Sequence, residues 1–266
     1  MFEIFQYSFM VRAFLAGLAI SIIAPLIGTF LVARRYSLIA DTMGHIALAG
    51  VAIGLFLGVS PLLSALVTAV VAALLIDRLR SGGRISGESA LALFLSGGLA
   101  LAVVLISLAH GFTVDLFSYL FGSITTVAKG DLVIMGVLGG TVITVVWIFY
   151  KELFYVSFDE DSAKVSGVPT LFINVLLVVL TAITVALSIR IVGTLLIGAL
   201  MVIPVVTASQ IARSFRQTLG ISVALSVFTV SFGLVLSYYA NLAAGGTIVL
   251  VSLVLFGIIL AFKRTS

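Results

Sequence analysis

The chain has 266 residues, of which 62% are hydrophobic and 9% are charged. This is too little polar surface to cover a soluble globule, so a membrane is the expected solvent. At about 20 apolar residues for each membrane-spanning helix, the length allows roughly eight to ten spans. Cysteine is absent, which excludes disulfides, thiolate metal sites and cysteine nucleophiles. The formal charge of +4 is explained by basic loops at a membrane surface, and no nucleic-acid partner is expected.

Apolar runs between charged or turn-forming clusters predict an all-α bundle of about nine transmembrane helices, within a range of eight to ten. No soluble domain is left over, so residues 1–266 are expected to form a single transmembrane domain. Almost no polar loop separates consecutive runs at Ser60 and Pro61, or from Ser188 to Arg190, so either pair could be a broken or re-entrant segment. The runs cover residues 13–33, 36–58, 60–77, 89–109, 130–150, 170–188, 190–211, 218–239 and 244–262.

The basic residues predict the orientation of these helices, because cytoplasmic loops of membrane proteins are enriched in Lys and Arg. With nine spans, alternate loops and the C-terminus hold eleven of the basic residues and the opposite set holds three. We therefore expect the N-terminus outside and the C-terminus in the cytoplasm. The larger set is Arg34, Arg35, Arg78, Arg80, Arg84, Lys151, Lys164, Arg213, Arg216, Lys263 and Arg264, and the smaller set is Arg12, Lys129 and Arg190.

The segment from Gly111 to Ala128 is amphipathic, with aromatic and leucine side chains among Asp, Ser and Gly. It is expected to lie at the outer interface or to dip inward, and a plain extracellular loop is the alternative. His110, at the outer end of the fourth run, is interpreted as an interfacial histidine rather than a ligand.

Asp41 and His45 are the ionisable pair embedded in the second run, where such groups are costly unless paired, hydrated or used. A spacing of four places the carboxylate and the imidazole on one helix face. These oxygen and nitrogen donors suit zinc, manganese or ferrous iron. Two ligands make a weak site, which suits an ion that must also leave. The alternative is a hydrogen bond between the two side chains that only fixes helix packing.

The same run carries Gly50, Gly54 and Gly58 at spacings of four, a smooth ridge that allows close helix packing. Gly50 lies nine residues beyond Asp41, about 180° around a helix. We therefore expect the glycine ridge to pack, and the polar pair to line a cavity or a subunit interface.

The connection of about residues 151–169 is the longest cytoplasmic loop, and its "SFDEDSAKVSGVP" predicts a short helix. Acidic residues Asp159, Glu160 and Asp161 would occupy the first turn, where the helix dipole favours negative charge. Gly167 followed by Pro169 would end it. The helix is a candidate docking element for a partner, and the alternative is a solvated turn with a good cap.

Five segments resemble one family, the permease subunits of ATP-binding-cassette importers for zinc, manganese and iron, known as ABC-3 metal permeases. The resemblance extends along nearly the whole chain. It is carried by "GTFLVARRYSLIADTMGHIALAGVAIG", "DLFSYLFGSITTV", "FDEDSAKVSGVP", "IRIVGTLLIGALMVIPVVTASQIARSF" and "LSYYANLAAGGTIVLVSLVLF".

The resemblance implies roles for particular positions. Asp41 and His45 match the family's Asp-x-x-x-His pair, which meets the metal ion in the translocation pathway. Asp159, Glu160, Ala163 and Gly167 would lie near the docking groove of the ATPase, all matching the family's cytoplasmic coupling segment. Thr42, Met43 and Gly44, between the two candidate ligands, depart from the commonest family pattern.

The resemblance also implies partners: two ATPase subunits, a second copy of the permease, an extracellular or periplasmic metal-binding receptor, and membrane lipid. The chain would be a multi-pass protein of a prokaryotic cell membrane with no permanently bound cofactor, its divalent metal being cargo. The phrases "IVGTLLIGALMVIPVVTA" and "SYLFGS" are more similar to the zinc branch than to the manganese branch, so zinc is the expected metal.

Two rival classes follow from the residues. A stand-alone secondary transporter would need coupling-ion sites and often inverted repeats, and no convincing internal repeat occurs. A membrane-embedded hydrolase would need a nucleophile with an activating base, and neither His45 nor His110 lies in a recognisable hydrolase motif. The chain has no Walker motif, so a primary transporter would need a separate ATPase, and this subunit is expected not to be an enzyme.

Overall fold

A computed structural model describes residues 6–81, 85–108, 116–125 and 127–264, and its twelve regular elements are all α-helices. Eight of these helices are long and apolar enough to cross a membrane. The predicted all-α bundle is therefore confirmed. The helices are α1 (Ser8–Ala33), α2 (Leu38–Leu57), α3 (Pro61–Ser81), α4 (Gly87–Leu108), α5 (Leu116–Phe121), α6 (Lys129–Ile148), α7 (Tyr150–Phe158), α8 (Glu160–Val165), α9 (Thr170–Ser188), α10 (Ile197–Ser209), α11 (Phe215–Ala240) and α12 (Ala244–Arg264).

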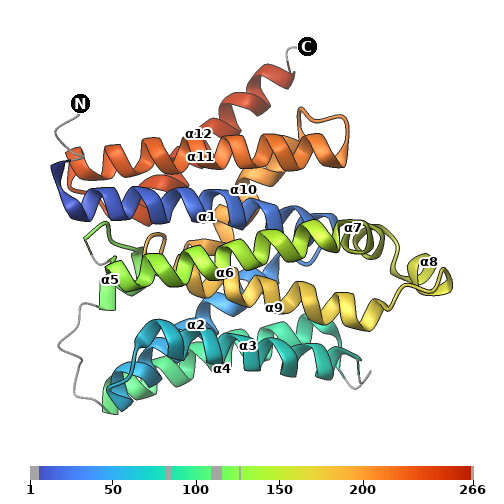
Figure 1. The fold of residues 1–266 in the computed structure, drawn as a ribbon, viewed down its shortest axis with the longest axis horizontal. Coiled ribbons are helices and arrows are strands. Elements are labelled where there is room, and N and C mark those ends of the chain that lie inside the picture. The colour runs from blue at the N-terminus through green and yellow to red at the C-terminus, as the bar shows by residue number, and fades with distance from the viewer. Residues whose placement is uncertain (1–5, 82–84, 109–115, 126, 265–266) are drawn as a thin grey trace.

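The long helices lie side by side in a bundle (Figure 1). Helices α2, α3 and α4 form one side of it, α11 and α12 form the other, and α1, α6 and α9 lie between. Close contacts join α2 to α3 and α4, α1 to α10 and α11, and α3 to α9. Helix α2 is the most buried of the eight long helices, whereas α4 is the most exposed. The second run of the sequence therefore forms a largely buried helix.

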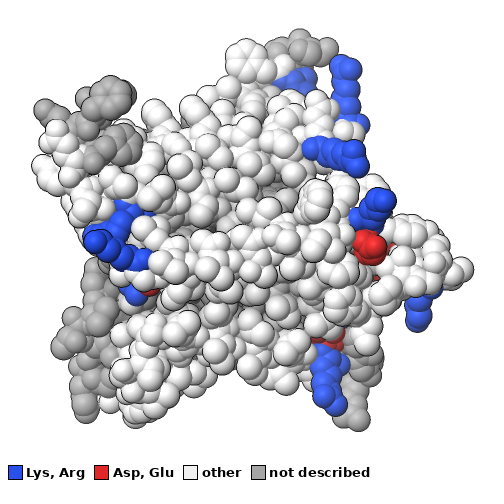
Figure 2. Space-filling model, viewed as in Figure 1, with Lys and Arg blue, Asp and Glu red and all other residues white. Residues whose placement is uncertain are grey.

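Charged side chains lie at the two ends of this bundle, and the band between them is almost uncharged (Figure 2). At the end that carries α7 and α8, Arg34 binds Glu160 and Arg80 lies over the ring of Tyr36. At the other end, Arg190 lies 3.4 Å from Asp131. The uncharged band is the physical requirement for a multi-pass membrane protein. Which end faces the cytoplasm stays a prediction from the charge bias.

The seventh predicted run, 190–211, is not one continuous helix. Helix α9 ends at Ser188, and a non-helical segment, residues 189–196, precedes the thirteen-residue helix α10. The break anticipated near Ser188 and Arg190 is thus confirmed. At Gly193 the backbone has φ +84°, a left-handed conformation that favours glycine, and an added Cβ would lie 2.6 Å from the Gly122 nitrogen. Glycine allows this segment to run against α5.

Helix α5 supplies hydrogen bonds that the broken backbone needs. The Thr194 and Leu195 N–H groups donate to the carbonyls of Tyr119 and Leu120, and the Ser123 N–H donates to the Arg190 carbonyl. Buried non-helical backbone is tolerated in a membrane protein when its polar groups are satisfied in this way. Of the predicted amphipathic segment 111–128, the part that forms α5 therefore packs against the break between α9 and α10, and its depth in the membrane stays a prediction. His110 and residues 111–115 lie outside the described residues.

Candidate functional site

Asp41 and His45 lie one turn apart on α2, and both side chains are partly buried. Within the described residues no hydrogen bond joins them, and His45 Nδ1 is buried with no hydrogen-bond partner. A buried imidazole nitrogen without a partner costs free energy unless another group uses it. The packing alternative required an Asp–His hydrogen bond, which the structure does not contain among these residues.

The polar face of α2 packs against the break between α9 and α10. An added Cβ at Gly44 would collide with the Thr194 carbonyl oxygen and would lie 3.5 Å from its carbon. An added Cβ at Gly198, in the first turn of α10, would lie 2.7 Å from Cγ of Asp41. Because Gly44 and Gly198 have no side chains, the non-helical segment and the start of α10 can approach the two candidate ligands. This face meets an irregular backbone of the same chain, a neighbour that the sequence interpretation did not include.

The position of Asp41 has an electrostatic consequence. Its carboxylate faces the first turn of α10, where the unpaired N–H groups and the helix dipole favour negative charge. Gly198 is eleven residues before Ser209, so Asp41 lies roughly 16 Å, at 1.5 Å per residue along the α10 axis, from the end of that helix. The carboxylate is thus placed away from the end of the bundle where α10 terminates.

The glycine ridge on the other side of α2 packs against α3, as expected. A Cβ added to Gly50 would lie 2.6 Å from Cα of Ala65, and a Cβ added to Gly54 would lie 2.9 Å from Cα of Pro61. Gly58 differs, because it has φ +68°, ends α2, and has open space around its Cα. Two glycines therefore form the α2–α3 contact and the third forms the turn before α3.

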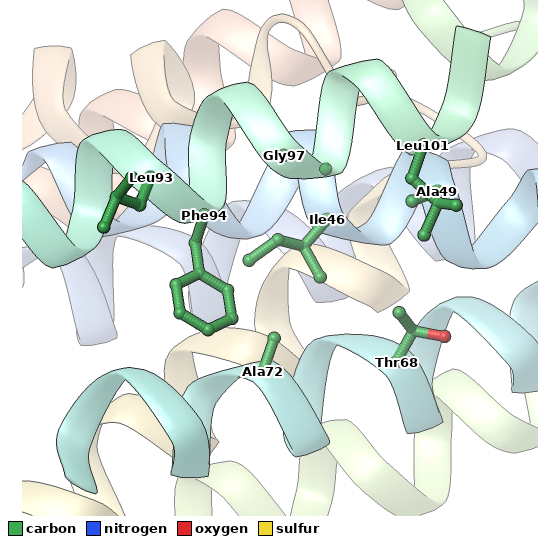
Figure 3. Close-up of a pocket in the computed structure, with 9 residues that line it drawn as sticks. Ile46, Ala49, Thr68, Ala72, Leu93, Phe94, Gly97 and Leu101 are labelled. Carbon is green, nitrogen blue, oxygen red and sulfur yellow. The ribbon is translucent and has the colours of Figure 1, made fainter. Parts of the chain in front are cut away.

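Helix α4 also approaches α2 closely, since an added Cβ at Gly98 would lie 3.1 Å from the His45 carbonyl carbon. Beside this contact, α2, α3 and α4 line an open cavity of about 320 Å³ (Figure 3). Ile46 of α2 and Phe94 of α4 point into it, and Thr68 of α3 is the one polar side chain of its lining. Asp41 and His45 do not line this cavity. Its apolar walls offer nothing to a metal ion.

Asp41 and His45 belong to no larger cluster of ionisable ligands. The described residues contain no group of three or more His, Asp or Glu side chains that could hold a metal ion. A site in this part of the chain therefore has two such donors, and further ligands must come from hydroxyl or backbone oxygens, water or another copy.

Helix α8 is capped at both ends, as the sequence predicted. The Asp159 carboxylate accepts a hydrogen bond of 2.9 Å from the Ser162 N–H, and Ser162 Oγ also donates to it. These hydrogen bonds lower the pKa of Asp159. At the other end, the Val168 N–H donates to the Ala163 carbonyl and the Gly167 N–H to the Lys164 carbonyl, which is a Schellman motif. Gly167 has φ +85°, so glycine is required there.

Glu160 points from α8 into the bundle. It forms an ion pair with Arg34, at the end of α1, and accepts a hydrogen bond of 2.6 Å from Asn174 of α9. Burial raises the pKa of Glu160, but the hydrogen bond from Asn174 and the charge of Arg34 outweigh it, so the net shift is downward. Because Arg34 ends α1 and precedes α2, this contact joins α8 to the connection that leads to Asp41.

The residues predicted for partner docking fall into two groups. Ala163 is fully buried and Glu160 is turned inward, so both hold α8 against the rest of the bundle. Asp159 and Gly167 are exposed, and the tip of α8 presents Val165 with 90% of its surface exposed.

Four residues of the site, Arg34, Asn174, Thr194 and Gly198, were not singled out from the sequence. Arg34 was used only in the charge count, because nothing in the sequence distinguishes it from its neighbour Arg35. Asn174 is a polar residue within the apolar sixth run, a signal that could have been used. Thr194 and Gly198 have no sequence signal of their own, because their role depends on the break between α9 and α10.

With this geometry established, comparisons with known proteins identify the class. The sequence profile of the ABC 3 transport family matches residues 6–263. A "Probable metal transport system membrane protein" of Treponema pallidum is 37% identical, covering 97% of each chain. The "High-affinity zinc uptake system membrane protein ZnuB" of Haemophilus influenzae is 33% identical, covering 97% of this chain and 99% of that one. The "Manganese import system permease protein ScaB" of Streptococcus gordonii is also 33% identical, covering 94% and 90%.

A solved structure has the same fold. The structure described as "PsaBC from Streptococcus pneumoniae in complex with Fab" matches with a TM-score of 0.86 and 33% identity, over 96% of this chain and 92% of that chain. The helical bundle and these matches define a membrane permease. The chain belongs to the ABC 3 transport family, as the sequence resemblance indicated. It is accordingly a transport subunit of the cell membrane and not an enzyme.

Proposed function

We propose that this chain is the channel-forming subunit of an ATP-binding-cassette importer that takes up a divalent transition metal, with zinc as its principal cargo. Asp41 and His45 are the ligands that the ion meets as it passes. The observation that carries this proposal is the unpaired Nδ1 of His45, one turn from the Asp41 carboxylate on the buried helix α2. Relatives named for zinc and for manganese are equally similar, so the metal must be measured.

The proposed ligand pair has the chemistry of a transit site. A carboxylate oxygen and a neutral imidazole nitrogen bind zinc well and manganese more weakly. Since only two ionisable donors are close together in the described residues, the ion would be held weakly enough to be released. The Asp41 carboxylate faces the start of α10, where the helix dipole favours negative charge.

Energy would come from a partner ATPase, with two ATPase subunits below two copies of the permease and a metal-binding receptor on the opposite side. We propose that the exposed side of α8, with Asp159, Val165 and Gly167, docks on the ATPase, while Glu160 and Ala163 transmit its movement inward. The ion pair of Glu160 with Arg34 and the burial of Ala163 support this division.

The test is ATP-dependent uptake of zinc-65 and manganese-54 into vesicles that contain the permease, its ATPase and its receptor. Wild type should take up zinc faster than manganese at equal concentration. Asp41→Asn and His45→Gln should each lower uptake by tenfold or more, whereas Glu88→Gln, which removes an exposed carboxylate from α4, should not. Uptake without ATP would overturn the class, and full uptake by both ligand variants would overturn the site.

A further inference from the structure

Thr194 combines two features that no packing role explains. Its side chain is 2% exposed, and its hydroxyl has no hydrogen-bond partner among the described residues. A buried unpaired hydroxyl costs free energy comparable to a lost hydrogen bond. The neighbouring buried threonines behave differently, since Thr181 and Thr184 donate to carbonyls of α9 at 2.7 and 2.8 Å. Thr194 thus lacks the carbonyl partner that these two buried threonines have.

Thr194 lies close to the proposed ligand pair. The residue lies in the non-helical segment 189–196, and its backbone packs on Gly44, which is next to His45 in α2. Two buried polar atoms without partners, His45 Nδ1 and Thr194 Oγ1, thus belong to residues on either side of one helix contact. Four residues further on, Gly198 meets the Asp41 carboxylate. Two of the buried side-chain atoms without partners among the described residues therefore belong to residues beside the proposed ligand pair.

The backbone around Thr194 has the form that membrane transporters use for ion sites. Helices broken at membrane depth supply oxygens to ions, because a non-helical segment frees donors and acceptors that a continuous helix would use. Here the N–H groups of Thr194 and Leu195 are held by α5, so the segment is fixed rather than frayed. The backbone that carries the hydroxyl is therefore held in place beside α2.

We propose that the Thr194 hydroxyl is a further oxygen ligand on the ion path, which acts with Asp41 and His45 on the partly hydrated metal ion. This inference rests on the proposed function, because it adds a donor to the same site. A neutral oxygen favours manganese more than zinc, since manganese prefers oxygen donors and zinc binds nitrogen more strongly. Thr194 would consequently widen the range of metals that the permease accepts.

The test compares Thr194→Val, which removes only the hydroxyl, with Thr194→Ser, which keeps it. Thr184→Val is the matched control, because that buried hydroxyl has a partner within α9. Uptake of zinc-65 and manganese-54 by the complete reconstituted importer is measured together with the melting temperature of the purified permease. Asp41→Asn is included in the same series.

We expect Thr194→Val to lower manganese uptake roughly three- to tenfold and zinc uptake less. A factor of this size corresponds to the loss of one contact about as strong as a hydrogen bond. Its melting temperature should equal or exceed that of wild type, because an unpaired polar group has been removed. Thr194→Ser and Thr184→Val should keep uptake within about twofold of wild type.

Three results would overturn the inference. If Asp41→Asn abolishes uptake while Thr194→Val stays within twofold of wild type, the hydroxyl is not a ligand and the proposed function stands. If Thr194→Val lowers both uptake and melting temperature, its role is structural. If Asp41→Asn transports normally, the proposed site fails and the inference fails with it.

Discussion

Gly198 offers a direct way to move a candidate ligand without removing it. In Gly198→Ala the new Cβ would lie 2.7 Å from Cγ and 3.3 Å from Oδ2 of Asp41, whereas ordinary carbon contacts need about 3.5–4.0 Å. The carboxylate must therefore shift by roughly 1 Å. Because it is the end of a side chain and not backbone, the fold can absorb the change. A displacement of that size at a reacting group can cost about a hundredfold.

We expect Gly198→Ala to fold, with a melting temperature close to that of wild type, and to lose at least tenfold in ATP-dependent zinc uptake. The assay is zinc-65 uptake into vesicles, with thermal unfolding measured on the same preparation. Gly140→Ala in α6 is the control, because an added Cβ there meets nothing within 4 Å. Wild-type uptake by Gly198→Ala would refute the placement of Asp41 on the ion path.

Three further changes test the contacts that hold the site. Glu160→Gln should lower stability by about 1 kcal/mol at neutral pH, a value reduced for solvent screening of this half-exposed carboxylate. Since the folded-state pKa of Glu160 is lowered, the stability that its ionised form provides should be lost as pH falls through that lowered value, so melting curves of wild type and variant should converge in acid. A constant difference at all pH values would contradict the ion pair. Gly167→Ala should cost about 1 kcal/mol because its φ is +85°, whereas Gly136→Ala, in open space within α6, should raise the melting temperature. Gly28→Ala should cost about 1–3 kcal/mol, since its Cβ would lie 2.9 Å from the Met201 carbonyl carbon and α1 must move from α10. An unchanged melting temperature would show that the two helices can separate freely.

The sequence predicted much of the fold because membrane solvation leaves few alternatives. Apolar run length identified the eight long helices, and the absence of a polar loop marked two candidate breaks, at Ser60–Pro61 and near Ser188, of which the second precedes α10. The short helix α8 was predicted with its ends, because Asp159 caps it and Gly167 stops it through local hydrogen bonds. Local patterns of this kind are readable from neighbouring residues alone.

The long-range contacts of the site were not predictable in the same way. Helical periodicity placed Asp41 and the glycine ridge on opposite faces of α2, and the ridge does pack on α3. It did not indicate that the polar face meets Gly198 and the backbone of Thr194, because that contact joins residues about 150 positions apart. Glu160 was assigned by resemblance to a partner surface, but its inward direction depends on Arg34, 126 residues earlier.

The central claim is that an ion passes Asp41 and His45 on α2, driven by a partner ATPase. The most direct measurement is zinc-65 uptake by the reconstituted importer, with and without ATP, for wild type, Asp41→Asn and His45→Gln. The account predicts ATP-dependent uptake by wild type and a loss of at least about tenfold in each variant, with ATPase assembly unchanged. Equal uptake by all three proteins, or wild-type uptake that does not need ATP, would contradict it.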